Sequence, residues 1–306
     1  MRIGLSGLGR NVDRMVEQAQ QAEADGFTSL WYASAVGGDP LVAMAVAGRA
    51  TSTVELGTAV LQTYACHPVL QANRAAAAVS AIGAPGRFTL GVGPSHQPVI
   101  EGILGLSYGT PGRHTDEYVQ ILTALLGGEQ VTFAGEELRV TAGPPPLMDG
   151  AKVPVLVAAL GPRLLRVAGR HAAGTITWMA NATAIERHVA PRIRKAAADA
   201  GRPDPRIVAG LPVAVHDDVA EAQSVAAQLF AAYGTLPNYR RILDVGGVAG
   251  PADAAIVGDE ASVAAQIEAL LAAGATDLWA APFPVGDDRS GSRARTRALL
   301  QELASS

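Results

Sequence analysis

The chain has 306 residues, of which 49% are hydrophobic and 17% are charged, so a large core is available and disorder is not expected. Its formal net charge of −4 argues against a surface for nucleic acid or another polyanion. The single cysteine, Cys66, excludes an intrachain disulfide. No signal peptide is recognised in the N-terminal MRIGLSG, and no apolar run is long enough to span a membrane, so we expect a cytoplasmic protein.

Short apolar runs alternate with longer helical patterns along the chain. The predicted strands span residues 2–6, 29–33, 54–60, 87–92, 155–159, 174–178, 206–215 and 275–281. The predicted helices span residues 11–25, 40–50, 68–81, 113–126, 162–172, 182–200, 218–233, 260–273 and 292–303. This alternation indicates parallel strands joined by crossover helices. Eight such units predict an α/β fold of the (β/α)8 TIM-barrel type, with a doubly wound open sheet as the alternative.

Glycine and proline mark the ends of several predicted helices. Gly26, Gly201 and Gly274 each follow a helix, where a left-handed residue commonly ends it. Pro40, Pro68 and Pro162 lie in first turns, where a missing N–H group costs nothing.

Two segments interrupt the alternation. Residues 128–152 contain a predicted hairpin, VTFAGEELRV, with its turn at residues 134–135, and residues 234–258 are rich in Gly and Pro. Long connections inside compact domains tend to be functional. We therefore expect a single barrel domain over residues 1–306 that carries two insertions.

Common catalytic motifs are incomplete in this sequence. Gly7 and Gly9 lack the third glycine and the later acidic residue of a dinucleotide fingerprint, so a tight barrel turn is the better interpretation. Ser95 lacks the Gly-x-Ser-x-Gly spacing of a nucleophile elbow. The six histidines form no His-Glu-x-x-His pair, so no metal site is expected.

Three strand ends carry the strongest functional pattern. They are residues 58–63, 91–96 and 158–163, and active sites of such barrels lie where strands end. The third is a turn of small residues that opens into a helix at Pro162, and its free backbone N–H groups suit a phosphate. Together the three segments predict a surface for a long phosphorylated cofactor.

The order and spacing of several longer segments resemble a known family. The segments are GFTSLWYA (26–33), ELGTAV (55–60) followed by His67 and Pro68, GRFTLGVG (86–93), LSYGTPGRHTDEY (106–118), PVLVAALGPRLLRVAGRHAAGTITWM (154–179) and VAGLPVAV (208–215). They are similar to the luciferase-like monooxygenase superfamily, in particular its actinobacterial branch that uses the deazaflavin coenzyme F420.

That resemblance implies a cofactor lying across the rim of the barrel. A non-proline cis peptide at Ala59 and Val60 would support its ring, and Thr63 matches a position that often reaches it. The phosphate turn would comprise Ala158, Ala159, Leu160, Gly161 and Pro162. Further cofactor-binding positions implied are Gly93, Ser95, His96 and Trp178.

The sequence also departs from the family pattern. Residues 33–38, at the exit of the second strand, contain no strong acid or base before Asp39. His96 stands where a related dehydrogenase carries a glutamate, so His96 is the candidate catalytic group, with Ser95 as a second source of a proton.

The resemblance implies a homodimeric oxidoreductase that moves a hydride between C5 of coenzyme F420 and a small organic substrate. Two alternatives remain open. One is an FMN-dependent monooxygenase, and the other is a cofactor-binding barrel without catalysis.

Overall fold

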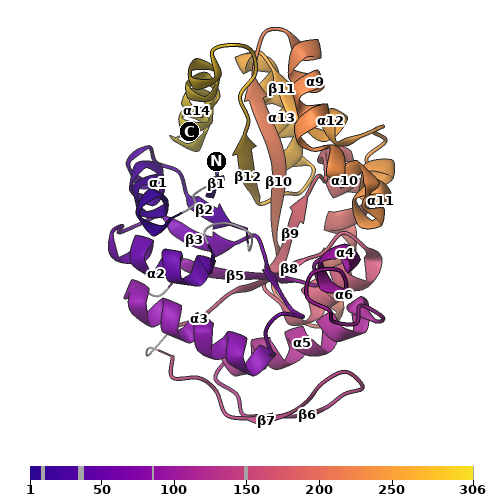
Figure 1. Cartoon of the computed structure of the whole chain (residues 1–306). Helices are drawn as coiled ribbons and strands as arrows, with labels where there is room; N and C mark the ends of the chain where they lie inside the picture. The colour runs from indigo at the N-terminus through magenta and orange to yellow at the C-terminus, as the bar shows by residue number, and fades with distance from the viewer. Residues whose placement is uncertain (8–10, 34–37, 85, 148–150, 306) are drawn as a thin grey trace.

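Eight parallel strands close into a barrel in the computed structural model, which describes residues 1–7, 11–33, 38–84, 86–147 and 151–305 (Figure 1). Pairing of β10 with both β9 and β12 completes the ring, so the TIM-barrel prediction is confirmed and the open sheet is wrong. The barrel strands are, in ring order, β12 (Asp277–Pro282), β1 (Ile3–Gly7), β2 (Ser29–Tyr32), β3 (Glu55–Thr58), β5 (Phe88–Gly93), β8 (Val155–Ala158), β9 (Gly174–Trp178) and β10 (Arg206–Val215). A short strand β4 (Leu61–Gln62) continues β3.

Helices surround the barrel and cover its apolar strands (Figure 1). The longer ones are α1 (Val12–Ala24), α2 (Pro40–Arg49), α3 (Pro68–Ile82), α5 (Pro111–Leu126), α6 (Pro162–His171), α8 (Ala190–Asp199), α9 (Val219–Leu229), α13 (Glu260–Ala272) and α14 (Arg289–Ser305). The predicted helix 182–200 is divided into α7 (Ala182–Ala184), a π-helical turn (Ile185–Val189) and α8. No helix among the described residues is both long and apolar enough to cross a membrane.

Glycine and proline residues lie at the helix ends where the sequence predicted them. Gly26, Gly201 and Gly274 all have positive φ, as expected for residues that end a helix. Pro40, Pro68 and Pro162 begin α2, α3 and α6. Residues 8–10, in the first glycine-rich turn, lie outside the described residues.

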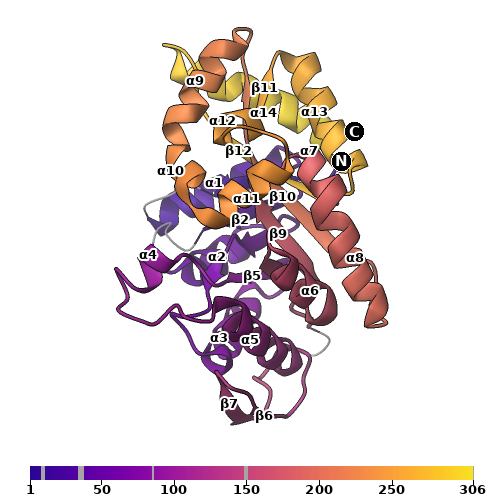
Figure 2. The same ribbon diagram turned by 90° about the vertical axis from the view of Figure 1, so that its right-hand side faces the viewer.

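The insertion at 128–152 forms the expected hairpin, which projects beyond α5 (Figure 2). Its strands are β6 (Val131–Ala134) and β7 (Arg139–Ala142). The turn lies at residues 135–138 rather than 134–135, because the Glu117 carboxylate accepts three backbone N–H bonds there. Residues 148–150 of this insertion lie outside the described part of the chain.

The insertion at 234–258 is more ordered than a Gly- and Pro-rich loop would be. It contributes α11 (Pro237–Val245), α12 (Pro251–Ala254) and β11 (Ile256–Gly258), and β11 pairs with the far end of β10. The prolines at 237 and 251 start the two helices rather than break structure. Before it, α9 ends at Leu229, and the rest of the predicted helix 218–233 falls in α10 (Ala231–Thr235).

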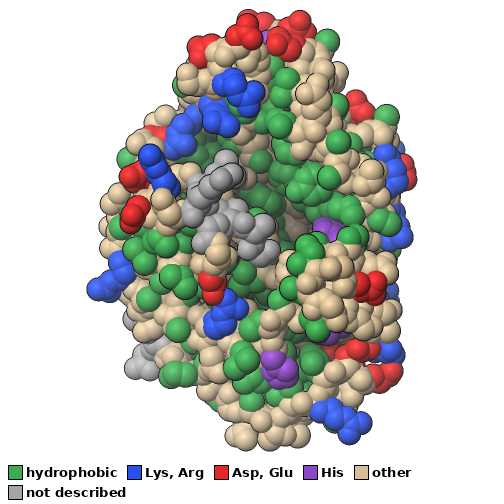
Figure 3. Space-filling model, viewed as in Figure 1, with side chains coloured by type: hydrophobic (Ala, Val, Ile, Leu, Met, Phe, Trp, Pro, Cys, Tyr) green, Lys and Arg blue, Asp and Glu red, His purple; other side chains and the backbone are tan. Residues whose placement is uncertain are grey.

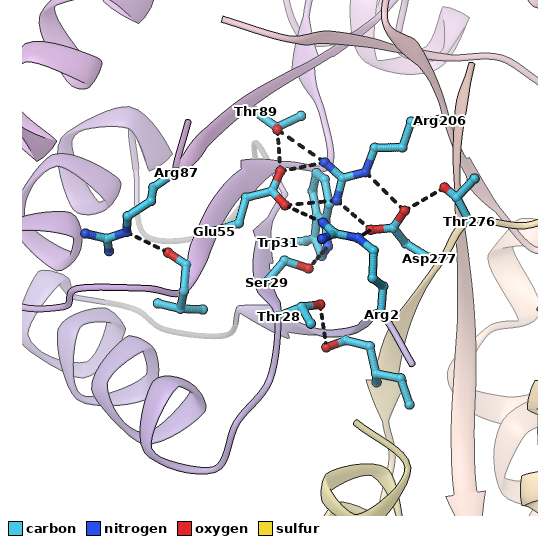
Figure 4. Close-up of polar contacts among 12 residues, drawn as sticks. Arg2, Thr28, Ser29, Trp31, Glu55, Arg87, Thr89, Arg206, Thr276 and Asp277 are labelled. Carbon is cyan, nitrogen blue, oxygen red and sulfur yellow. Dashed lines mark hydrogen bonds and ion pairs between the residues drawn. The ribbon is translucent and has the colours of Figure 1, made fainter. Parts of the chain in front are cut away.

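A network of charged side chains closes the N-terminal end of the barrel (Figure 4). The Arg206 guanidinium lies between the carboxylates of Glu55 and Asp277, at 2.6 Å from each, and Arg2 contacts the same two acids at 2.9 and 2.8 Å. Arg206 also lies over the Trp31 ring. Ion pairs therefore fill this end of the barrel.

Candidate functional site

A cavity of about 620 Å³ opens over the C-terminal ends of the strands. This volume lies within the usual range of small-molecule sites. Small side chains of Ser6, Ala59, Gly93, Ala158 and Ala281 form its floor. The floor therefore allows a flat molecule to lie close to the strand ends.

A bulge where β3 meets β5 shapes one side of this floor. Gly57 pairs with Thr89 and Leu61 with Val92, so β3 and β4 contain one more residue than β5 over this interval. The Ala59–Val60 peptide bond within the bulge is cis, as the family resemblance implied, and both residues line the cavity.

A cationic rim borders another side of the cavity. Gly161 precedes α6 in extended conformation, and no side chain caps the N–H groups of the first turn. Arg163 and Arg241 line the cavity beside it, and within the described residues neither guanidinium has a hydrogen bond or an ion pair. His188 holds the carbonyl oxygen of Leu160 at 2.8 Å and so fixes the turn. Free N–H groups and two unpaired guanidinium groups can together bind a phosphate.

His96 follows β5 and is half-buried on the cavity wall. Burial lowers the pKa of its imidazole, which favours the neutral ring. Its ring centroid lies 5.5 Å from that of Tyr239. Ser95 has a positive φ of 64°, and its carbonyl oxygen accepts a 2.8 Å hydrogen bond from Tyr108, which fixes the bend before His96.

The cavity brings together most of the residues that the sequence singled out. Its lining includes Ala59, Val60, Gly93, Ser95, His96, Ala158, Leu160, Gly161, Pro162 and Trp178. Ala159 is fully buried in the core instead. The Thr63 side chain is 2% exposed and its hydroxyl has no partner within the described residues, so it too lies behind the cavity surface. Residues 34–37, at the exit of the second strand, lie outside the described part of the chain.

Several lining residues had not been selected from the sequence. Tyr108 and Arg241 lie after and within helices, and an isolated arginine or tyrosine there gives no recognisable motif, whereas Arg163 belongs to the strand-end segment 158–163 but was not named as a site residue. The others are aromatic side chains at the rim, namely Phe230, Tyr233, Tyr239, Trp279 and Phe283. The run of Phe230, Tyr233 and Tyr239 at the edge of the Gly- and Pro-rich insertion was the available signal for an aromatic wall.

Comparison with known proteins identifies the family. The model of the luciferase-like monooxygenase family matches residues 2–287, and the chain belongs to this family. The 5,10-methylenetetrahydromethanopterin reductase of Methanolobus tindarius is 27% identical over 94% of this chain and 86% of its own length. The F420-dependent hydroxymycolic acid dehydrogenase of Mycobacterium tuberculosis is 30% identical over 69% of this chain and 62% of its own length.

The fold of the chain also has close counterparts among solved structures. The coenzyme F420-dependent tetrahydromethanopterin reductase of Methanopyrus kandleri has a TM-score of 0.79 and 19% identity, with 99% of this chain and 97% of that chain covered. At this level of identity the similarity establishes the shared barrel.

Proposed function

We propose that this protein is an F420-dependent oxidoreductase that acts on a small organic substrate. The observation that carries the proposal is a single cavity that joins a floor of small residues to a cationic rim at the start of α6. Relatives that are reductases or dehydrogenases, one of them named as F420-dependent, support it. When bound, the deazaflavin would supply a C5 position that donates or accepts a hydride.

The residues present fit such a cofactor. Ala59, Gly93 and Ala158 have no side chain beyond Cβ, and together with Val60 they line the cavity and leave room for a planar ring. The turn at Gly161 with Arg163 and Arg241 would hold the phosphate. The protein would thus orient the ring and exclude water from one of its faces.

His96 is the group that would hold or move a proton at the substrate. It lies on the cavity wall near the strand ends, and its lowered pKa favours a neutral imidazole that can accept or donate a hydrogen bond. Ser95 lines the same part of the cavity and is the alternative group.

The family description makes an FMN-dependent monooxygenase the competing function. Titration calorimetry with coenzyme F420 and with FMN, on protein freed of bound cofactor, separates the two. We expect a dissociation constant in the micromolar range or below for F420 and much weaker binding for FMN. Purification with stoichiometric FMN and no measurable F420 binding would overturn the proposal.

A barrel that binds the cofactor without catalysis is tested separately. The oxidised and reduced forms of F420 differ in absorbance, so turnover can be followed in the presence of panels of carbonyl compounds and alcohols. F420 binding with no turnover across such panels would support the non-catalytic alternative.

A further inference from the structure

A continuous set of aromatic rings forms one wall of the cavity. We call Trp178, Trp279, Phe230, Tyr233 and Tyr239 the aromatic belt, and all five line the cavity. Trp178 is the central member, with ring centroids 5.0 Å from Trp279, 5.8 Å from Tyr233 and 6.1 Å from Phe230. Tyr239 extends the belt, 4.9 Å from Tyr233, and its other neighbour is His96 at 5.5 Å. Because each ring contacts the next, the belt is one continuous aromatic surface.

The belt lies on a different side of the barrel from the part of the floor formed by Ala59 and Gly93. Trp178 ends β9 and Trp279 lies within β12, and the remaining rings come from the segment of α10 and α11. In the ring of strands, β12 is four positions from β5, which carries Gly93, and is therefore opposite to it. A cofactor ring on the floor beside Ala59 and Val60 would leave the belt for a second flat molecule.

Charge restricts what that molecule can be. Among the described residues, no Asp or Glu lines the cavity, and its permanent charges are the guanidinium groups of Arg163 and Arg241. A cationic ligand would lose its hydration without gaining a counterion, whereas a neutral or anionic ligand would not meet this cost.

The polar atoms of the belt favour a ligand with an acceptor oxygen. The Trp178 Nε1–H group is buried and has no partner within the described residues, and an indole N–H can only donate. Burial raises the pKa of Tyr233, and burial together with Tyr233 raises that of Tyr239, so both phenols stay protonated at neutral pH. A carbonyl oxygen on the ligand would give the indole the partner that it lacks.

We propose that the substrate is a flat, conjugated carbonyl compound without positive charge, which stacks on the aromatic belt and accepts a hydrogen bond from Trp178. The assignment as substrate rests on the proposed F420-dependent function, whereas the binding chemistry rests on the belt itself.

Three matched probes test this inference. Chromone is flat and carries a conjugated carbonyl, chroman lacks the carbonyl, and N-methylquinolinium is flat but cationic. We expect calorimetry on the F420-saturated protein to give an affinity for chromone at least fivefold higher than for chroman, and no measurable binding of N-methylquinolinium. Equal or tighter binding of the cation would overturn the proposal.

Variants separate stacking from hydrogen bonding. Trp178→Phe keeps a ring without the N–H group. The affinity of this variant for chromone should fall to the affinity of the unmodified protein for chroman. Trp178→Leu removes both contacts and should reduce chromone affinity at least tenfold. Phe133→Leu on the distant hairpin is the control and should leave the affinity for chromone unchanged. Unchanged chromone binding in folded Trp178→Leu protein contradicts the inference.

An F420 titration of the same samples distinguishes failure of the substrate assignment from failure of the proposed function. Normal F420 binding without preference for chromone overturns the substrate class and leaves the proposed function standing. Absence of F420 binding overturns the proposed function and, with it, the assignment of such compounds as substrates.

Discussion

The hydroxyl group of Thr58 contacts both backbone polar groups of Gly91, donating to the carbonyl oxygen and accepting from the amide, each at 2.8 Å. The hydroxyl thereby takes the place of backbone hydrogen bonding between β3 and β5 at the bulge. A side chain at Gly91 is excluded, because its Cβ would lie 2.0 Å from the Thr58 carbonyl oxygen. This contact holds the strand ends that carry Ala59 and Val60.

Replacing Thr58 by valine should therefore destabilise the barrel. Thr58→Val leaves two buried backbone groups of Gly91 without their partner, and we expect the free energy of unfolding to fall by about 1–3 kcal/mol. Thr58→Ser retains the hydroxyl and is the control, with a smaller loss. Urea denaturation measures both, and a valine variant as stable as the serine variant would contradict the role of the hydroxyl.

Gly161→Val should weaken cofactor binding without affecting the fold. Gly161 has φ −88° and ψ 157°, which any residue can adopt, and a Cβ atom there would have Arg241 as its nearest neighbour at 3.9 Å. The valine side chain would instead obstruct the N–H groups of α6, and we expect F420 affinity to fall at least tenfold, about 1.4 kcal/mol.

The matched control is Gly143→Val, at an exposed glycine of the hairpin segment with open space around it. F420 affinity should be unchanged in this variant. Unchanged binding in folded Gly161→Val protein would place the phosphate elsewhere on the rim.

The barrel could be predicted because its signals are local and repeated. Each strand is a short apolar run, and residues such as Gly26 and Pro40 mark helix ends through their own backbone preferences. Strand ends of a parallel barrel must meet at one rim, which is why Gly93, Ala158 and His96 were correctly brought to a common cavity.

The features that could not be predicted depend on tertiary packing. Thr63 follows the bulge, and the sequence does not reveal that its side chain turns into the core instead of the cavity. Tyr233 reaches Trp178, and Tyr239 reaches Tyr233, because α10 and α11 fold over the rim (Figure 2). No local preference of the chain indicates that approach.

We expect a homodimer, and exposed apolar side chains indicate where it would form. Val42 and Val46 on α2 are 57% and 46% exposed, and Leu70 on the neighbouring α3 is 58% exposed. Figure 3 shows hydrophobic side chains on this face over α2. Contact with a second copy would remove this apolar surface from water.

Light scattering at micromolar concentration should give the mass of a dimer, and Val46→Asp combined with Leu70→Asp should give a monomer. Leu229→Asp changes a similarly exposed leucine on α9 and should leave the dimer intact. A monomer mass for the unmodified protein would refute the prediction.

The ion network at the other end of the barrel should make stability depend on acid pH. Burial of Asp277 opposes its ionisation, yet hydrogen bonds and charge pairing with Arg206 hold its pKa below the ordinary value of 3.8. The contribution of ionised Asp277 to the free energy of unfolding is therefore fully present above the ordinary pKa. It is lost as pH falls through the lower pKa of the folded state.

Asp277→Asn should lower the free energy of unfolding at pH 7 by about 3–5 kcal/mol, because Arg206 loses one partner of a buried pair. Asp204→Asn breaks an exposed pair with Arg194 and should cost at most about 1 kcal/mol. Denaturation at several pH values between 7 and 2 checks both variants and the expected loss of stability in acid. If Asp277→Asn and the unmodified protein were equally stable at pH 7, the network would not be a source of stability.

The last prediction concerns His96 as the group that exchanges a proton with the substrate. His96→Ala should lower turnover about 10²–10⁴-fold, the usual range for a lost general acid or base. F420 affinity should change less than tenfold, because the proposed phosphate contacts at Gly161 are untouched.

Burial lowers the pKa of the His96 imidazole below 6.5, so a neutral ring predominates at pH 7. If that neutral ring is the proton acceptor, the rate should fall as pH drops through the lowered value, and this limb should vanish in the alanine variant. His216→Ala changes a histidine outside the cavity lining and should retain full turnover. Full turnover in His96→Ala would instead assign the proton to water or to Ser95, which Ser95→Ala would then distinguish.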